Sequence, residues 1–276
     1  MENLPDWISI ILLGLIEGVT EFLPISSTGH LLIPQTLGWL PRQSDLFSIV
    51  IQSGAVIAVI AVFTDRIKQL ASTLRERETQ SYLAKLAVAF IVTAVGGLVI
   101  KKLKIELPET VTPVAWATLT GAFVIFAVEF WRKNHSGVPD VSWRIAVAVG
   151  LAQTLAAVFP GTSRSGASIL IAMALGAARS AATEFSFLLG VPTLMAAGVF
   201  QTFSAIQEGK AGSEDWGMIA LGTLVSAISA FIVVRWLIHF VQSHTFNGFA
   251  WYRLVMGAAL LIYVGMQAGA EAGLED

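Results

Sequence analysis

Long hydrophobic runs separated by short polar segments dominate the pattern of this chain. A helix needs about 20 apolar residues to cross a bilayer. A run at 86–100 becomes long enough if it extends back to Tyr82 with the Lys85 side chain reaching the membrane surface. Six further runs contain no Asp, Glu, Lys or Arg and lie at 46–63, 111–128, 145–163, 185–206, 216–234 and 254–270. This pattern predicts an all-α polytopic membrane protein.

A polar interruption divides the first hydrophobic segment, 7–39. Its first part is apolar apart from Glu17 and Glu21, and it ends at Pro24, because proline disfavours helical geometry in the residue before it. A polar run follows at 26–30, and apolar residues then resume. Non-helical backbone at membrane depth is tolerated only inside the protein or against a wet cavity. We therefore expect 7–39 to be a re-entrant helix-loop-helix that returns to its own side.

The composition excludes several classes of protein. Only 13% of the 276 residues are charged and 55% are hydrophobic, whereas soluble domains carry about 25% charged residues. The mean hydropathy of +0.73 agrees with a membrane protein. Seventeen cations against 19 anions leave no basic surplus for a nucleic acid, so no nucleic-acid partner is expected. The absence of Cys excludes disulfides and thiolate chemistry.

The chain also resembles itself at an offset of 136 residues. The first stretch, with its apolar run, proline and hydroxyl-rich loop, has a counterpart in the second half: Gly14-Leu15-Ile16-Glu17 matches Gly150-Leu151-Ala152-Gln153, Phe22-Leu23-Pro24 matches Val158-Phe159-Pro160, and Ser26-Ser27 matches Thr162-Ser163. We therefore predict one membrane domain, 1–276, built from two repeats, 1–135 and 136–276. Each repeat would hold one re-entrant helix-loop-helix and three transmembrane helices, six spans in total. Because three is odd, the repeats would have inverted topology.

The distribution of cations predicts the orientation. Only five cations fall on one side of the predicted topology, and three of them, Lys101, Lys102 and Lys104, form the one loop that disagrees with the orientation given below. The mixed-charge segment 65–81 lies on the other side, as a solvated loop. That other side carries eleven cations: Arg66, Lys68, Arg75, Arg77, Lys85, Arg132, Lys133, Arg144, Arg179, Arg235 and Arg253. By the positive-inside rule it is cytoplasmic, and both termini would face outward.

Two acidic residues in the first segment are candidates for chemistry. Glu17 and Glu21 are four residues apart and therefore share one helix face. Ionisable residues within a membrane are expensive and functional by default. The pair could hold a divalent cation through its oxygens, or one carboxyl could act as an acid or base. The plainer alternative places both at the interface, facing water.

Two hydroxyl-rich loops supply the remaining candidates. Ser26, Ser27, Thr28 and His30 stand where a second helix would begin, so hydroxyls and free backbone N–H groups could converge on an anion. Taken by itself, such a string is more commonly a hydroxyl N-cap with a turn glycine. The second loop favours phosphate binding, because it places Arg164 in an otherwise apolar region. If both loops meet near the midplane, these groups surround one cavity.

These stretches resemble a known family. Residues 17–30 and 160–167 closely resemble the two signature stretches of the bacterial undecaprenyl-diphosphate phosphatases, the bacitracin-resistance family, and 184–189 looks like a third. The resemblance implies an inner-membrane enzyme that removes the terminal phosphate of undecaprenyl diphosphate and recycles the lipid carrier of cell-wall synthesis. It also implies a divalent cation, Mg²⁺ or Ca²⁺, and an active site open to the periplasm.

Carried over residue by residue, the resemblance assigns the site. The catalytic residues would be Glu17, Glu21, Ser27, His30 and Arg164, with Glu17 and Glu21 also the metal ligands. The supporting phosphate ligands would be Ser26, Thr28, Ser163 and Ser165. Ser27 is the candidate nucleophile with Glu21 or His30 as its base. Attack by water or by His30 is the alternative.

Two other functions compete with this assignment. Acid-phosphatase-like lipid phosphatases need a second histidine six residues after their motif arginine, and Leu170 stands there. Inverted repeats with broken helices also occur in secondary transporters and would suit a lipid flippase. The carboxylate pair beside a Ser/His loop and an arginine favours hydrolysis. The expected partners are therefore a polyprenyl diphosphate and the bilayer, with a homodimer left open.

Overall fold

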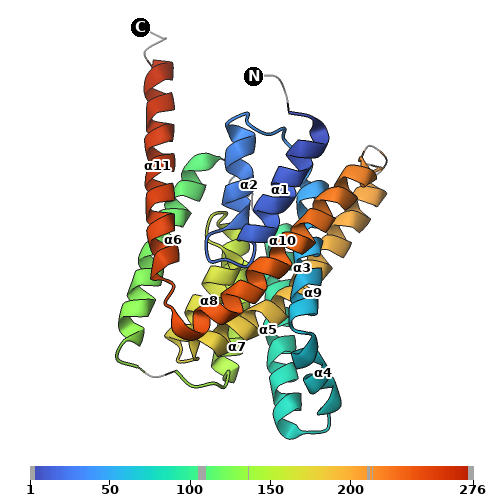
Figure 1. The fold of residues 1–276 in the computed structure, drawn as a ribbon, viewed down its shortest axis with the longest axis vertical. Helices are drawn as coiled ribbons and strands as arrows, with labels where there is room; N and C mark the ends of the chain where they lie inside the picture. The colour runs from blue at the N-terminus through green and yellow to red at the C-terminus, as the bar shows by residue number, and fades with distance from the viewer. Residues whose placement is uncertain (1–3, 105–109, 136, 210–211, 213, 273–276) are drawn as a thin grey trace.

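The computed structural model describes residues 4–104, 110–135, 137–209, 212 and 214–272, and in this part of the chain it forms eleven helices. Six of them are long and apolar enough to cross a membrane, which confirms the predicted all-α polytopic fold and its six spans. These helices are α3 (Asp45–Val62), α5 (Arg77–Lys102), α6 (Val111–Arg132), α9 (Arg179–Gln207), α10 (Trp216–Ser243) and α11 (Asn247–Ala272) (Figure 1).

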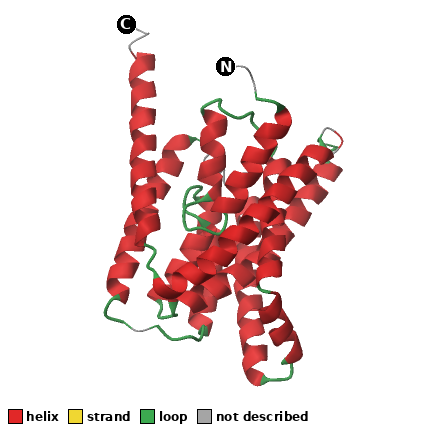
Figure 2. Cartoon of the chain, viewed as in Figure 1, coloured by secondary structure: helices red, strands yellow, loops and turns green. Residues whose placement is uncertain are grey.

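Four shorter helices form two consecutive pairs, each joined by a loop. The first pair is α1 (Asp6–Thr20) and α2 (Ser27–Thr36), and the second is α7 (Trp143–Val158) and α8 (Arg164–Ala174). At about 1.5 Å per residue each helix is about 15 to 24 Å long, shorter than the ~30 Å hydrocarbon core. A connecting loop lies among the helices in the middle of the molecule (Figure 2). That each pair re-enters on its own side stays a prediction.

Each pair packs its first helix against a long helix of the other half. Helix α1 packs on α10, and α7 packs on α5. Glycines allow both approaches: a Cβ added to Gly14 would lie 2.7 Å from the Gly222 carbonyl oxygen, and one added to Gly150 would lie 2.7 Å from the Ala89 carbonyl oxygen. Gly14 and Gly150 are 136 residues apart, the offset of the sequence match. The packing therefore supports the two repeats, while their inversion stays a prediction.

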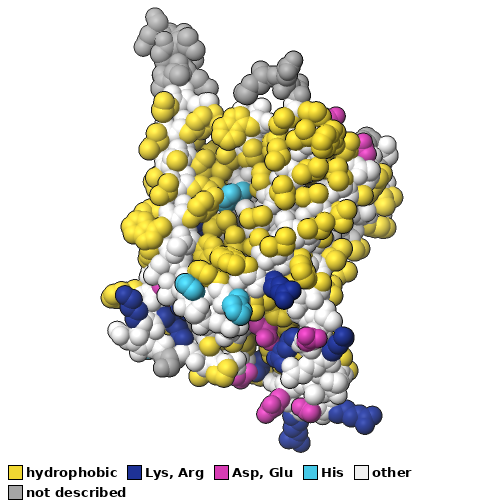
Figure 3. Space-filling view, viewed as in Figure 1, with side chains coloured by type: hydrophobic (Ala, Val, Ile, Leu, Met, Phe, Trp, Pro, Cys, Tyr) yellow, Lys and Arg dark blue, Asp and Glu magenta, His cyan; other side chains and the backbone are white. Residues whose placement is uncertain are grey.

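The outer surface is apolar where the long helices face outward. Ile91 of α5, Val199 of α9 and Val255 of α11 are all more than half exposed. Hydrophobic side chains cover most of one face, whereas charged ones gather at the end that holds α4 (Figure 3). A soluble protein rarely exposes so much continuous apolar surface. The protein is therefore a multi-pass membrane protein.

Two expectations about charged segments need correction. The segment 65–81, predicted as a solvated loop, is largely helical, because it contains most of the helix α4 (Thr64–Ser72) and the first turn of α5. Arg253, counted among the cytoplasmic cations, is only 1% exposed and lies inside the protein. It lies in the second turn of α11, where its side chain is enclosed by the protein.

Candidate active site

The loops that end α1 and α7 have the same backbone conformation at one serine each. Ser26 (φ 73°, ψ 100°) and Ser163 (φ 70°, ψ 115°) both lie at positive φ, which costs about 1–3 kcal/mol in a residue other than glycine. Each serine Oγ caps the next helix by accepting from the N–H of a glycine three residues later, at 3.4 Å from Gly29 and 3.1 Å from Gly166. The two loops are therefore built alike.

The shared conformation of Ser26 and Ser163 shifts the sequence match between the two halves by one residue at these loops. Because Ser26 and Ser163 are the equivalent caps, the first helical residues Ser27 and Arg164 are equivalent to each other. The second loop holds one more residue between proline and cap, and it contains Gly161 at φ +97°. A Cβ on that glycine would lie 2.6 Å from the Val114 carbonyl oxygen, so the loop requires glycine there.

Glu21 brings the two loops together. It lies in the turn after α1, where its Oε2 accepts from Ser27 Oγ at 2.5 Å and its Oε1 accepts from Arg164 Nη2 at 2.6 Å. The Glu21 side chain is 6% exposed and that of Arg164 is 29% exposed. The same arginine nitrogen donates to Gln52 Oε1 of α3 at 3.1 Å. A hydroxyl, a carboxylate and a guanidinium therefore form one connected group.

His30 contacts a different set of groups. Its Nδ1 lies 2.7 Å from the Ser26 carbonyl oxygen, and its Nε2 lies 2.6 Å from Tyr252 Oη, with the two rings stacked. Because a carbonyl only accepts, Nδ1 carries the proton and Nε2 accepts from the tyrosine hydroxyl. Glu21, rather than His30, is thus the partner of Ser27. Sequence reasoning missed Tyr252, and its only signal there was a Tyr-Arg pair at the start of the last apolar run.

Three of the four expected phosphate ligands hold the loops in place. Ser163 Oγ donates to the Leu23 carbonyl at 3.3 Å, and Ser165 Oγ lies 3.0 Å from the same carbonyl and 3.2 Å from that of Glu21. Ser26 serves as a helix cap. Thr28 is exposed on the first turn of α2. These contacts join loop to loop, and the structure does not bring the four hydroxyls to one point.

Glu17 lies one turn before Glu21 and is fully buried. Neither of its carboxylate oxygens has a hydrogen-bond partner among the described residues. A buried carboxylate without a partner is costly, and a cation would offset that cost. No group of three His, Asp or Glu side chains suited to a metal occurs among the described residues. The carboxyl groups of Glu17 and Glu21 supply the oxygen donors that a divalent cation prefers, but they are fewer than the three side chains of such a group.

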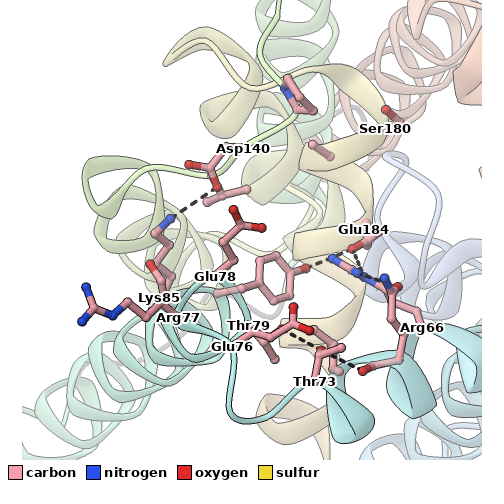
Figure 4. Close-up of a pocket in the computed structure, with 17 residues that line it drawn as sticks. Arg66, Thr73, Glu76, Arg77, Glu78, Thr79, Lys85, Asp140, Ser180 and Glu184 are labelled. Carbon is pink, nitrogen blue, oxygen red and sulfur yellow. Dashed lines mark hydrogen bonds and ion pairs between the residues drawn. The ribbon is translucent and has the colours of Figure 1, made fainter.

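The two large cavities lie beside these residues rather than among them. A polar pocket of about 810 Å³ (Figure 4) contains none of the predicted site residues, and two ion pairs lie in its wall, Arg66 with Glu184 at 2.8 Å and Lys85 with Asp140 at 3.3 Å. An apolar groove of about 920 Å³ runs along α6, α7 and α8 and reaches Pro24, Thr162 and Gly166 at the loops. The groove therefore leads to the backbone that carries the site.

Comparison with known proteins identifies the family. The family described as "Bacitracin resistance protein BacA" matches residues 10–259. A relative from Rhizobium etli, named undecaprenyl-diphosphatase, is 48% identical over 93% of this chain and 96% of its own length. Another of the same name, from Xanthomonas oryzae pv. oryzae, is 48% identical over 96% of this chain and 99% of its own length. Since the match covers nearly the whole of each protein, this chain belongs to the bacitracin resistance protein family.

Proposed function

We propose that the protein hydrolyses undecaprenyl diphosphate to undecaprenyl phosphate and inorganic phosphate. This reaction recycles the lipid carrier of cell-wall synthesis and underlies resistance to bacitracin. The observation that carries the proposal is Glu21, which binds the Ser27 hydroxyl through one oxygen and the Arg164 guanidinium through the other. Those three groups are the ones that a serine-based phosphoryl transfer requires. The names of the relatives support the same reaction.

In the proposed mechanism Ser27 Oγ is the nucleophile and Glu21 is its base. The Ser27 proton already points at Glu21 Oε2. As Oγ bonds to the terminal phosphorus, the bond from phosphorus to the bridging oxygen breaks, undecaprenyl phosphate leaves, and Glu21 takes the proton. Water then attacks the phosphoserine, which releases inorganic phosphate and restores the hydroxyl. His30 is the weaker nucleophile, because both of its ring nitrogens are engaged.

Arg164 and two helix ends supply positive charge for the phosphates. Only Nη2 of Arg164 hydrogen-bonds to another described residue, so Nε and Nη1 keep three N–H groups for phosphate oxygens. The arginine is also the partly exposed member of the group. Helices α2 and α8 begin at the two loops, and their N-termini favour anions there. These groups would stabilise the charge on the transferring phosphoryl group.

A divalent cation, Mg²⁺ or Ca²⁺, is part of the proposal. Glu17 would hold it, because its carboxylate is buried and without a partner among the described residues, and Glu21 stands one turn away. When bound, the cation would neutralise charge on the diphosphate. Since the described residues offer no complete set of ligands, we expect the cation to bind together with the substrate.

The apolar groove suits the hydrocarbon part of the substrate. Its wall is formed almost entirely by apolar side chains of α6, α7 and α8, among them Trp116, Leu151 and Leu170. One end reaches the loops that carry Ser27 and Arg164. A long isoprenoid chain would lie in this groove while its diphosphate reaches the loops. Burial of apolar surface would then contribute to affinity without entering the chemistry.

We further propose that the site opens to the periplasm and that both termini lie on that side. The start of α1 and the end of α11 lie at the same end of the molecule (Figure 1). The charged side chains around α4 gather at the other end (Figure 3). The positive-inside rule assigns that charged end to the cytoplasm, which supports the proposed orientation.

Phosphate release by purified protein in detergent tests the function. We expect undecaprenyl diphosphate to yield one phosphate per lipid, undecaprenyl phosphate to yield none, and a chelator to stop the reaction until a divalent cation is restored. Ser72→Ala is a matched hydroxyl deletion on α4, far from the loops, and should keep the wild-type rate. Turnover that chelator leaves unchanged would contradict the cation, and absence of turnover in the wild type would contradict the phosphatase.

A further inference from the structure

Arg253 of α11 is a buried cation whose hydrogen bonds are complete. Its side chain is 1% exposed, and a guanidinium carries five N–H groups. Each nitrogen donates to backbone carbonyl oxygens: Nε to Thr118 at 3.1 Å, Nη1 to Pro24 at 3.1 Å and Thr162 at 3.4 Å, and Nη2 to Ala117 at 3.0 Å and Gly161 at 3.0 Å. Five donors therefore meet five acceptors.

The acceptors come from three separate parts of the chain. Pro24 belongs to the first loop, Gly161 and Thr162 to the second loop, and the other two carbonyls to α6. No carboxylate pairs with this guanidinium among the described residues, so carbonyl dipoles alone compensate its charge. A buried cation is costly unless it is fully hydrogen-bonded. Here one arginine supplies the hydrogen-bond donors that the five carbonyl groups would otherwise need from separate partners.

Neighbouring residues make room for this arrangement. Gly121 of α6 faces the guanidinium so closely that an added Cβ would collide with Nη2. Both loops also carry peptide groups that no helix satisfies, because each loop ends one helix and begins another. Arg253 thus provides the hydrogen bonds that the carbonyls of the loops lack.

We propose that Arg253 is a positioning residue of the phosphatase reaction: it holds the two loops in the mutual position that lets Glu21 reach both Ser27 and Arg164. The inference rests on the proposed function and adds a residue to it. Pro24 stands between Glu21 and Ser27, and Thr162 stands two residues before Arg164, so the clamped carbonyls lie within the segments that carry the reacting groups. Because all five N–H groups are used, Arg253 does not itself bind the phosphate.

Lysine at this position keeps the charge but not the geometry. An ammonium has three N–H groups at one point, whereas the five carbonyls surround a planar fork. Arg253→Lys should therefore lower kcat by about 30-fold, because the reacting groups on the two loops would no longer be held in their productive positions. KM should change by less than about threefold. Arg179→Lys is the matched control: Arg179 is a half-buried arginine held by Glu129 at 2.6 Å, away from the loops, and should keep the wild-type kcat.

A double-mutant cycle separates positioning from stability. If Arg253 acts through the placement of Arg164, then Arg253→Lys in an Arg164→Lys background should cost less than about threefold, because the placement no longer matters. A purely structural role would multiply the two losses instead. Full multiplication of the two losses would overturn the inference.

Hydrogen exchange of the whole protein in detergent supplies a readout that needs no turnover. Arg253→Lys should speed exchange at least about tenfold in peptides covering 21–30 and 159–166, and leave those of α9 and α10 unchanged. Gly121→Ala should reproduce the effect by displacing the guanidinium, whereas Gly97→Ala, where a Cβ meets nothing within 4 Å, should not. Unchanged loop exchange in Arg253→Lys would overturn the inference, while a wild type without phosphatase activity would overturn only the proposed function.

Discussion

The two loops of this protein share a backbone but differ in chemistry. Each loop follows a short helix, holds a serine at positive φ and caps the next helix with that serine. In the first loop the residue after the cap is Ser27, and in the second it is Arg164. The same backbone conformation thus presents a hydroxyl from one half and a guanidinium from the other, the proposed nucleophile and the proposed phosphate ligand. The two loops therefore share their geometry, and the residues at the equivalent positions, Ser27 and Arg164, give them different chemistry.

The helices before the loops show the same contrast. Glu17 and Gln153 are equivalent by the 136-residue offset, and both are buried with an oxygen that lacks a partner among the described residues. Of the two, only the glutamate has an ionisable side chain. The first half therefore holds the acidic groups, Glu17 and Glu21, and the second half holds the arginine that neutralises one of them.

The largest expected effect comes from removing the carboxylate of Glu21, the proposed base. Glu21→Gln keeps the shape but cannot accept the Ser27 proton, so kcat should fall by about 100- to 10,000-fold. Glu17→Gln should weaken turnover less, and excess divalent cation should restore part of it. Glu76→Gln, an exposed glutamate between α4 and α5, is the control and should behave as wild type. Substantial activity of Glu21→Gln would remove the carboxylate from the chemistry.

Replacing the cation of the second loop should have the next largest effect. Arg164→Lys loses the planar fork that contacts Glu21 and is free to bind phosphate oxygens, so kcat should fall about 100-fold and KM should rise. Steady-state kinetics with undecaprenyl diphosphate would measure both. Arg144→Lys, an exposed arginine at the start of α7, should change neither. An Arg164→Lys protein with wild-type kinetics would contradict its role.

The two capping serines test how far the loops differ in structure. Ser26→Ala and Ser163→Ala each delete one cap, which should cost about 1 kcal/mol of stability. Ser163→Ala should cost more, because its hydroxyl also donates to the Leu23 carbonyl of the other loop. The kcat of each variant should fall by no more than about 5- to 10-fold, which corresponds to a rise of roughly 1 to 1.4 kcal/mol in activation free energy. Thermal unfolding in detergent would show the difference, and a larger loss for Ser26→Ala would contradict it.

The smallest expected effect concerns His30, at the start of α2. Tyr252→Phe removes the hydroxyl on His30 Nε2 but keeps the stacked ring. A single neutral hydrogen bond is worth about 0.5–1.5 kcal/mol, so kcat should fall about 2- to 10-fold. Tyr263→Phe, farther along the same helix, is the control. A loss above 100-fold would assign the tyrosine a direct part in the reaction.

Much of this arrangement could be predicted from the sequence because it depends on local pattern. Apolar runs of sufficient length predict the six spans, and Pro24 and Pro160 predict the breaks that form the loops. The internal match predicts that Ser27 and Arg164 belong to equivalent loops. Glu21 could be expected near Ser27 because it directly precedes the first loop. The positions of these residues depend mainly on their own segments of the chain.

The rest depends on contacts between distant segments. Arg253 lies 229 residues from Pro24, and from the sequence alone a single arginine beside an apolar run looks like an interface anchor. The one-residue shift between the loops depends on backbone angles at Ser26 and Ser163, which hydropathy does not report. Helix α4 has only nine residues and two larger apolar side chains on one face, Ile67 and Leu70, so a search for long apolar runs passes over it. The structure was needed for each of these.

The most direct measurement is phosphate release from undecaprenyl diphosphate by Ser27→Ala at saturating substrate. Wild-type protein should release phosphate with steady turnover. The variant should keep less than about a hundredth of the wild-type kcat, a loss of at least roughly 2.7 kcal/mol. Its equilibrium affinity for the lipid should stay within about threefold, because Arg164 and the helix ends remain. A variant that keeps more than that hundredth would contradict Ser27 as the nucleophile and assign the attack to water or to His30.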